Sequence, residues 1–199
     1  MQLSISSLMN RIPTIIFGGS FDPVHNGHLA LAAEACNKVP GAELWFMLSP
    51  LNPHKVGRAM SPEDVRLRML QLAIGGDARF KACDFELSLP RPSYTVNTLA
   101  ALEDAYPGRE FILLIGADNW EKFDKWYKWE TILSRYRIIV YPRGGEDVPS
   151  LPAGVEWLSA RLYDVSSTMV RDAVAVGGDV SAMVPVAVAQ YIKDNNLYK

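Results

Sequence analysis

The segment Thr14–His28, TIIFGGSFDPVHNGH, joins a short apolar run to a glycine-containing loop and to the start of a helix. Thr14–Gly18 is rich in β-branched residues and is followed at once by a second glycine, which is typical of a buried parallel strand. His28–Val39 is rich in Ala and Leu and predicts a helix directly after the loop. The segment therefore predicts a strand–loop–helix unit, the building block of a parallel sheet.

Strands and helices alternate along the rest of the chain with short connections. Apolar or β-branched runs predict further strands at Glu43–Leu48, Arg79–Leu87, Glu110–Ile115, Arg137–Tyr141 and Val155–Leu158. Helices are expected from Ser61 to about Gly75, at Tyr94–Tyr106, from near Ser167 to Gly177, and from near Pro185 onward. This alternation predicts an α/β fold: a doubly wound, Rossmann-like parallel sheet with helices on both faces and a C-terminal helical segment. No clean linker interrupts it, so we expect one domain over residues 1–199, with residues 1–11 as a flexible extension.

The composition is that of a globular protein, because 49% of the 199 residues are hydrophobic and 21% are charged. The 20 basic and 22 acidic side chains give a formal net charge of −2, which argues against a dedicated nucleic-acid binder. The chain start lacks a signal-peptide pattern and no segment has the apolar length of a membrane span, so we expect a cytoplasmic protein without a membrane contact. Arg66 and Arg68 fall in the second predicted helix and are expected to form surface ion pairs.

The loop Gly18–His28 has features that suit phosphate. Gly18 and Gly19 let the backbone approach a ligand closely. His25 and His28 stand at the start of the predicted helix, where free N–H groups and the positive end of the helix dipole favour an anion. The loop matches neither the P-loop nor the G-x-G-x-x-G dinucleotide fingerprint. From these residues alone, a phosphate site and a glycine-rich turn with surface histidines are both open interpretations.

Two further segments carry polar side chains that have an ordinary alternative role. In the segment NPHK, His54 and Lys55 could bind an anion or lie on the solvated surface. In the segment Val165–Arg171, VSSTMVR, the hydroxyl groups could bind phosphates or only cap the predicted helix. Neither segment decides the function without its context in the chain.

The segment Gly18–His28, GGSFDPVHNGH, resembles the signature of the HxGH nucleotidyltransferase superfamily and, within it, that of the nicotinate-mononucleotide adenylyltransferases. NPHK resembles the PPHK segment of the bacterial enzymes, and VSSTMVR resembles their ISSTxxR motif. The stretch Ser93–Leu99, SYTVNTL, resembles their SYTxDTL stretch. Gly116-Ala117-Asp118, followed by Trp126-Tyr127, resembles their GxD…W pattern. The motifs keep the order they have in the family, which identifies the single domain as a nucleotidyltransferase domain.

The resemblance implies three groups of site residues. The catalytic group is His25, His28, Lys55 and Arg171. The ATP-binding group is Gly18, Gly19, Ser20, Phe21, His25, His28, Gly116, Asp118, Ser166, Ser167, Thr168 and Arg171. The group that binds the mononucleotide is Asp22, His54, Lys55, Ser93, Tyr94, Thr95, Asp118, Trp126 and Tyr127. No residue is assigned as a protein ligand of a metal.

The resemblance further implies adenylyl transfer from ATP, accompanied by Mg²⁺, to nicotinate mononucleotide in NAD biosynthesis. A phosphate dianion is already a nucleophile near neutral pH, and we see no Ser-His-Asp or Cys-His constellation, so positioning and charge stabilisation would carry the reaction. Three alternatives stay open: the same chemistry on nicotinamide mononucleotide or phosphopantetheine, a non-catalytic nucleotide-binding sensor, and a Rossmann dehydrogenase, against which the missing fingerprint counts. A homo-oligomer is compatible with the sequence.

Overall fold

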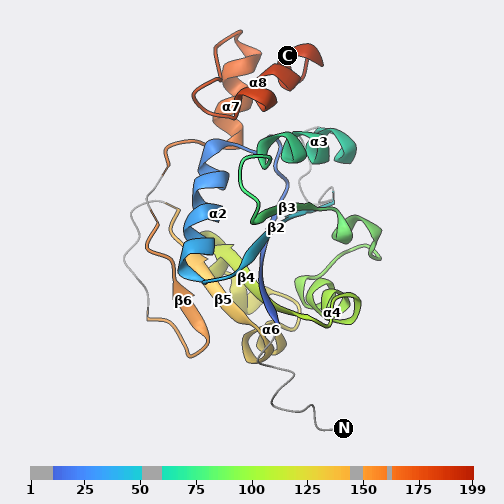
Figure 1. Ribbon diagram of the computed structural model, residues 1–199, viewed down its shortest axis with the longest axis vertical. Helices are drawn as coiled ribbons and strands as arrows, with labels where there is room; N and C mark the ends of the chain where they lie inside the picture. The colour runs from blue at the N-terminus through green and yellow to red at the C-terminus, as the bar shows by residue number, and fades with distance from the viewer. Residues whose placement is uncertain (1–10, 51–59, 144–149, 161–162) are drawn as a thin grey trace.

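The computed structural model describes residues 11–50, 60–143, 150–160 and 163–199. Its strands form one parallel sheet in the order β3-β2-β1-β4-β5-β6 (Figure 1). The strands are β1 (Ile12–Gly19), β2 (Glu43–Leu48), β3 (Phe80–Cys83), β4 (Arg109–Gly116), β5 (Arg137–Tyr141) and β6 (Val155–Trp157). The strand order reverses between β1 and β4, which places the topological switch point of the sheet there. The predicted doubly wound parallel sheet is confirmed.

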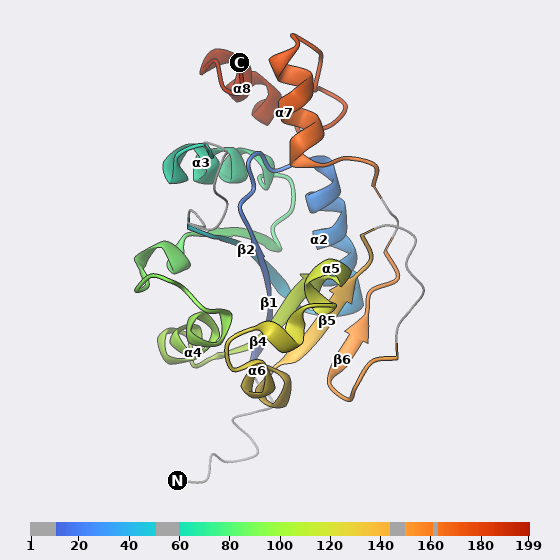
Figure 2. The same ribbon diagram turned by 180° about the vertical axis from the view of Figure 1, so that it is seen from behind.

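Different helices cover the two faces of the sheet (Figures 1 and 2). Successive residues of β1 point to opposite faces, so Ile15 lies in one core cluster and Ile16 in the other. The first cluster includes buried side chains of α2 (Asn26–Lys38) and α3 (Glu63–Ala73). The second includes those of α4 (Thr95–Ala105) and α6 (Trp129–Arg135). Burial on both faces explains why the central strands are continuous apolar runs rather than alternating ones.

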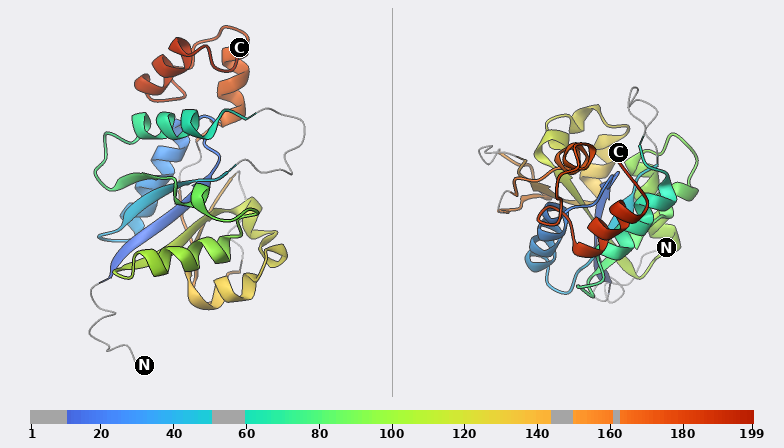
Figure 3. Two further views of the ribbon diagram at one scale, coloured as in Figure 1. Left: turned by 90° about the vertical axis from the view of Figure 1, so that its right-hand side faces the viewer. Right: turned by 90° about the horizontal axis from the view of Figure 1, so that it is seen from above.

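The chain ends in α7 (Ser167–Ala175) and α8 (Val186–Asp194), which confirm the predicted C-terminal helical segment. These helices lie beyond one end of the sheet, above α3 and the N-terminal end of α2 (Figures 1 and 3). Val170, Val188 and Ile192 belong to the same buried cluster as α2 and α3. The C-terminal segment is therefore part of the core that supports this end of the sheet.

The predicted strand Arg79–Leu87 is wrong in its second half. β3 ends at Cys83 and is followed by the 3₁₀ helix η1 (Phe85–Ser88). β3 is an edge strand paired only with β2, and the last pair in their register is Met47 with Cys83. Because β2 ends one residue further on, a longer β3 would have no partner for its backbone groups.

The Trp-rich segment between β4 and β5, for which the sequence predicted no element, forms α5 (Ala117–Trp120), η2 (Phe123–Lys125) and α6. Phe123 is buried at its centre, and three rings surround it with centroids 5.1, 5.4 and 6.3 Å away: Trp120, Trp126 and Trp129. Short helices of this kind carry no clear 3.6-residue periodicity, so aromatic packing rather than pattern defines the segment.

Part of the sequence-based expectation falls outside the described residues. Of the predicted flexible extension, residues 1–11, the structure describes only Arg11. Within the described part of the chain, no helix is long and apolar enough to cross a lipid bilayer. A single domain over residues 1–199 stays a prediction.

Candidate active site

The carboxyl ends of four neighbouring strands meet at one edge of the sheet. β1 leads into the glycine-histidine loop, β2 into Ser49, β4 into α5, and β5 toward Arg143. The loop after β1 occupies the centre because β1 lies between β2 and β4. Ligands of open parallel sheets bind at this edge, beside the switch point, so the predicted site residues lie where the fold places a site.

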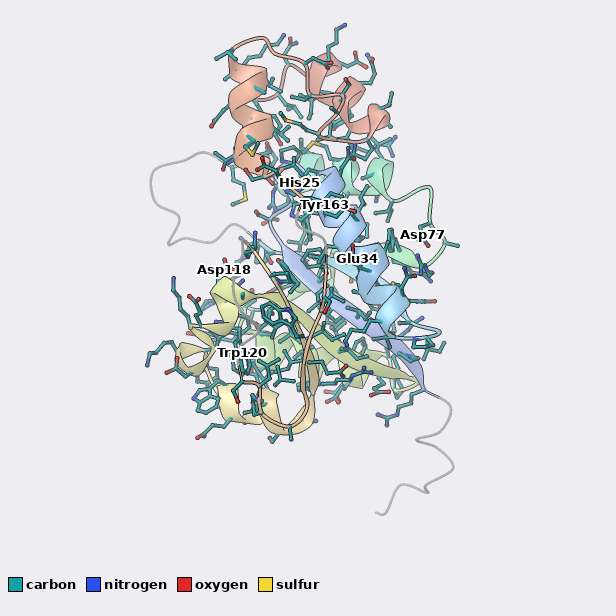
Figure 4. The ribbon with its side chains drawn as sticks, turned by 90° about the vertical axis from the view of Figure 1, so that its left-hand side faces the viewer. His25, Glu34, Asp77, Asp118, Trp120 and Tyr163 are labelled. Carbon is teal, nitrogen blue, oxygen red and sulfur yellow. The ribbon has the colours of Figure 1, made fainter. Side chains whose placement is uncertain are left out.

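His25 and His28 lie against each other at the N-terminus of α2. Their ring centroids are 3.6 Å apart and the rings are stacked. The backbone N–H of His25 donates to Nδ1 of His28 at 3.2 Å. A neutral His28 therefore carries its proton on Nε2, from which it can donate a hydrogen bond to a phosphate oxygen. Figure 4 shows His25 at the end of α2, next to the start of α7.

The surroundings of both histidines favour the neutral imidazole. Burial, helped by the positive charge of Arg143, lowers the pKa of His25 from 6.5 to about 4. Burial also holds the pKa of His28 well below 6.5, with smaller contributions from His25 and Arg143. At neutral pH and without nucleotide, the pair therefore offers hydrogen-bond donors rather than positive charges.

The loop that carries the histidines is fastened to α7. The Ser167 hydroxyl donates to the Pro23 carbonyl at 2.8 Å, and the Arg171 guanidinium donates to the Asp22 carbonyl. These contacts bring the N-terminus of α7 next to that of α2, so two positive helix-dipole ends face one region. The structure thus joins two motifs that lie more than 140 residues apart in the chain.

The remaining hydroxyls of the Ser166–Arg171 motif bond within α7. The Ser166 side chain caps the helix by accepting from the Met169 N–H at 3.2 Å. Thr168 Oγ1 accepts from the Arg171 guanidinium at 2.8 Å. Capping, the ordinary alternative for these residues, is therefore observed for Ser166, and the ATP contacts of the motif stay a prediction.

A cavity of about 860 Å³ opens beside the loop and reaches to the start of α4. It is lined by predicted mononucleotide residues, namely Ser93, Tyr94, Thr95 and Trp126, and by the predicted ATP residues Gly18 and Gly116. The cavity thus holds part of the predicted mononucleotide group and touches the predicted ATP group at these two glycines, while His25, His28 and the Ser166–Arg171 motif are not in its lining.

The structure separates the candidate aromatic residues by position. Trp120, Trp126 and Trp129 all pack partly buried against the second core cluster, and of the three Trp126 also lines the cavity. Tyr127, predicted to bind the mononucleotide, is exposed and is not part of the cavity lining. Its ring packs on that of Tyr94 with centroids 4.6 Å apart, so Tyr127 contacts the cavity only through Tyr94.

A polar cluster that the sequence did not single out lies in the cavity wall. Glu86 accepts a hydrogen bond from the Ser49 hydroxyl at 3.4 Å, and the hydroxyls of Ser93 and Thr98 also lie beside it. Burial raises the pKa of Glu86, and the three hydroxyls act in the opposite direction. Ser93 and Thr98 belong to the SYTVNTL stretch, whereas Ser49 and Glu86 come from two other parts of the chain, so the stretch alone does not reveal the cluster.

Asp118 and Arg143 meet at the ends of β4 and β5, with Arg143 Nε 3.2 Å from Asp118 Oδ1. A Cβ on Gly116 would overlap both groups, so this close approach requires glycine. Figure 4 shows Asp118 on the sheet side of the site, across from His25. Arg143 was missed from the sequence. Its only local signal was its place after a strand that ends at this edge.

Phe21 and Asp22, both predicted to contact ligands, have partners inside the protein. The Phe21 ring is buried and packs edge-on against His28 with centroids 5.1 Å apart. Asp22 is 6% exposed, and its Oδ1 accepts from the Tyr198 hydroxyl at 2.6 Å. Their contacts with ATP or mononucleotide stay predictions.

The predicted surface ion pair of Arg66 is wrong, because Arg66 is fully buried. Its Nε donates to the Ser61 carbonyl at 2.9 Å, and its Nη1 donates to the carbonyls of Ser20 and Ser49 at 2.8 and 3.0 Å. Ser20 and Ser49 follow the ends of β1 and β2, where carbonyls have left the sheet ladder, and a guanidinium satisfies several such acceptors at once. Arg68 is exposed, as expected.

Two predicted site residues, His54 and Lys55, belong to residues 51–59 and lie outside the described residues. Within the described ranges, no group of three or more His, Cys, Asp or Glu side chains could hold a metal ion.

The sequence matches the model of the cytidylyltransferase-like family over residues 16–173. A protein of Bacteroides thetaiotaomicron named "Probable nicotinate-nucleotide adenylyltransferase" is 46% identical over 187 residues, which cover 93% of each chain. The chain belongs to the nicotinate-nucleotide adenylyltransferase family. A second adenylyltransferase of that name, from Bacillus licheniformis, is 36% identical over 92% of this chain and 97% of its own.

Solved structures of an adenylyltransferase share the fold. The Plasmodium falciparum nicotinic acid mononucleotide adenylyltransferase complexed with NaAD has a TM-score of 0.74 at 19% identity, covering 94% of this chain and 97% of that one. The same protein complexed with APC also has a TM-score of 0.74, at 18% identity. These likenesses show that the chain shares the fold of that protein over nearly its whole length.

Proposed function

We propose that this chain transfers the adenylyl group of ATP to nicotinate mononucleotide, giving nicotinate adenine dinucleotide and pyrophosphate. The observation that carries the proposal is the neutral histidine pair at the N-terminus of α2, fastened to α7 by Ser167, in the loop whose first residue, Gly18, lines a large cavity. The names of relatives up to 46% identical agree with it. The function would serve NAD biosynthesis.

In the proposed reaction, a phosphate oxygen of the mononucleotide attacks the α-phosphorus of ATP in line. One O–P bond forms and the bond from the α-phosphorus to the pyrophosphate oxygen breaks, so no proton has to be removed from a dianionic nucleophile. His28 would donate from Nε2 to a phosphate oxygen, and Arg143 and Arg171 would supply positive charge nearby. Lys55 would add a further cation. Catalysis then consists of positioning and charge stabilisation.

Magnesium is part of the proposal as the ion that accompanies ATP. It would neutralise charge on the phosphates as pyrophosphate leaves. The measurement is the initial rate against Mg²⁺ concentration, with a chelator as the zero point. A rate that is unchanged in excess chelator would remove Mg²⁺ from the proposal.

The side chains that line the cavity beside the loop support nicotinate mononucleotide as the acceptor. Trp126 offers an indole face and Tyr94 a phenol ring, both suited to stacking on a pyridine ring. Thr95 opens α4, so the positive end of that helix dipole faces the cavity and favours the carboxylate of nicotinate over the amide of nicotinamide. Nicotinamide mononucleotide and phosphopantetheine are the runner-up acceptors.

The deciding experiment measures pyrophosphate release from ATP with nicotinate mononucleotide, nicotinamide mononucleotide and phosphopantetheine side by side. The highest kcat/KM is expected with nicotinate mononucleotide, and fastest turnover of phosphopantetheine would overturn the acceptor. His28→Ala should lower kcat by about a hundred- to a thousandfold. A near wild-type kcat in His28→Ala would contradict the role assigned to His28. If the wild-type protein released no pyrophosphate with any acceptor, the enzyme would be refuted and the alternative of a nucleotide-binding sensor would be favoured.

We also propose that the enzyme works in the cytoplasm, where ATP and mononucleotides are present. Its partners would be these small molecules, with no nucleic acid and no membrane. Self-association into a homo-oligomer is tested by light scattering on the purified protein, in which a mass of 22.1 kDa would indicate a monomer.

A further inference from the structure

The C-terminal end of the chain reaches the loop that carries the catalytic histidines. Tyr198, the penultimate residue, donates its hydroxyl to Oδ1 of Asp22 at 2.6 Å. Asp22 stands three residues before His25. Tyr198 and Asp22 are 176 positions apart in the sequence. This hydrogen bond therefore joins the segment after α8 to the loop after β1, two segments that are far apart in the sequence.

Asp22 is a buried acid beside a region that we assign to polyphosphate. Its second oxygen, Oδ2, accepts from the Ser61 N–H at 3.3 Å, so both oxygens are engaged by groups that come from α3's entry and from the C-terminus. Asp22 is not part of the cavity lining. A carboxylate repels phosphate strongly in a poorly solvated site. Holding the Asp22 carboxylate inside the protein and out of the cavity lining therefore favours nucleotide binding.

The Tyr198 side chain is built to act as a permanent donor. It is partly buried, packs against the first core cluster, and has its hydroxyl 3.9 Å from the sulfur of Met69. Burial, together with the hydrogen bond to Asp22, raises the pKa of Tyr198 above its usual value, so the phenol keeps its proton. The backbone leads it there through the bond from Leu197 N–H to the Ile192 carbonyl at the end of α8.

The same short loop is held from α7 as well. Ser167 and Arg171 bind the carbonyls of Pro23 and Asp22, whereas Tyr198 binds the Asp22 side chain. The anchors from α7 bind only backbone carbonyls, so the Asp22 carboxylate is held by two other donors, the Ser61 N–H on Oδ2 and the Tyr198 hydroxyl on Oδ1. Tyr198 gives the shorter of these two hydrogen bonds, three residues before His25.

On the basis of the proposed function, we propose that Tyr198 is a positioning residue for adenylyl transfer. It fixes the Asp22 carboxylate inside the protein and thereby sets the placement of the loop from which His25 and His28 address the phosphates. Tyr198 does not line the cavity and its hydroxyl is bonded to Asp22, so its effect on catalysis would pass through Asp22.

The test is Tyr198→Phe, which removes one oxygen and keeps the packing. Its matched control is Tyr191→Phe, because Tyr191 packs against the same cluster and its hydroxyl has no hydrogen-bond partner among the described residues. Tyr198→Phe should lower kcat/KM for ATP about tenfold, as expected for loss of a hydrogen bond to a charged group. The KM for the mononucleotide should stay close to that of Tyr191→Phe, whereas the thermal midpoint should fall below that of Tyr191→Phe, because Asp22 Oδ1 loses a buried donor.

A double-mutant cycle with Asp22→Ala separates positioning from general stability. If Tyr198 acts through Asp22, adding Tyr198→Phe to Asp22→Ala should cost less than twofold. An undiminished tenfold cost in that background, or equal kinetics of Tyr198→Phe and Tyr191→Phe, would overturn the inference. If Asp22→Ala does not fold, the comparison of the two Tyr→Phe variants decides alone. Inactive wild type would instead refute the proposed function.

Discussion

Replacing Arg66 tests whether its hydrogen bonds to three backbone carbonyls at the carboxyl edge of the sheet stabilise the fold. Arg66→Met keeps most of the side-chain length but removes every donor to the carbonyls of Ser20, Ser49 and Ser61. The three acceptors sit where water does not reach the guanidinium, because Arg66 is fully buried. They would be left without these donors.

The magnitude follows from the number of bonds and from the charge. A hydrogen bond to a charged donor contributes about 1.5–3 kcal/mol, so three of them exceed 4 kcal/mol before any offset. Removing a buried charge returns part of that cost, because burying an ion is itself unfavourable. We expect a net loss of about 3–5 kcal/mol in the free energy of unfolding. For a chain of this size the thermal midpoint should fall by roughly 6–20 °C.

Urea unfolding followed by tryptophan fluorescence measures the change, since the chain has five Trp residues. Arg68→Met is the matched control, because Arg68 is exposed on the same helix. Arg66→Lys should recover only part of the loss, as an ammonium lacks the planar fork that reaches separate acceptors. Unfolding free energies of Arg66→Met and Arg68→Met within 0.5 kcal/mol of each other, about the usual effect of a surface substitution, would refute this reasoning.

Two further predictions concern the histidine pair and the cavity. His25 has a pKa of about 4 in the fold against 6.5 when exposed, so below pH 6.5 the unfolded chain binds a proton that the folded one does not. The free energy of unfolding should therefore drop by about 3 kcal/mol on account of His25 as the pH falls from 6.5 to 4. Urea titrations at several pH values should show a shallower drop for His25→Asn than for wild type. Parallel curves of unfolding free energy against pH for the two proteins would contradict the prediction. Trp126→Ala should raise the KM for the mononucleotide about tenfold with little change in the KM for ATP, in steady-state assays in which each substrate is varied in turn. An equal rise in both values would point to damage of the fold instead.

Local patterns were enough to predict the sheet and the centre of the site. The run TIIFG at Thr14–Gly18 and the glycine pair after it are decided by neighbours in sequence, and β1 forms there. The extension of Arg79–Leu87 beyond Cys83 failed because strand length depends on the partner strand, which no local pattern reports. Elements fixed by neighbouring residues were thus predictable, and elements fixed by distant pairing were not.

The same division explains the site. His25 and His28 could be found because the chemistry that they need lies within one loop and one helix start. Arg66 could not, because its acceptors stand 46 and 17 residues away, and a charged residue in an amphipathic helix is normally on the surface. Arg143 follows β5 and Glu86 lies in the short helix η1 after β3, and neither belongs to a motif, so only the fold shows that both line the cavity.

Because the histidine pair is neutral, the positive charge of the site comes from other side chains. Burial is the main reason that the pKa values of both histidines lie below 6.5, and the positive charge of Arg143 lowers both further, so the neutral rings are favoured. Uncharged rings lie in place as donors without the cost of burying cations before ATP arrives. Permanent charge is left to guanidinium groups, whose protons do not leave at any physiological pH. Under the proposed function, the histidines would supply hydrogen-bond geometry and Arg143 and Arg171 would neutralise charge, so that the two functions would not compete within one pair of rings.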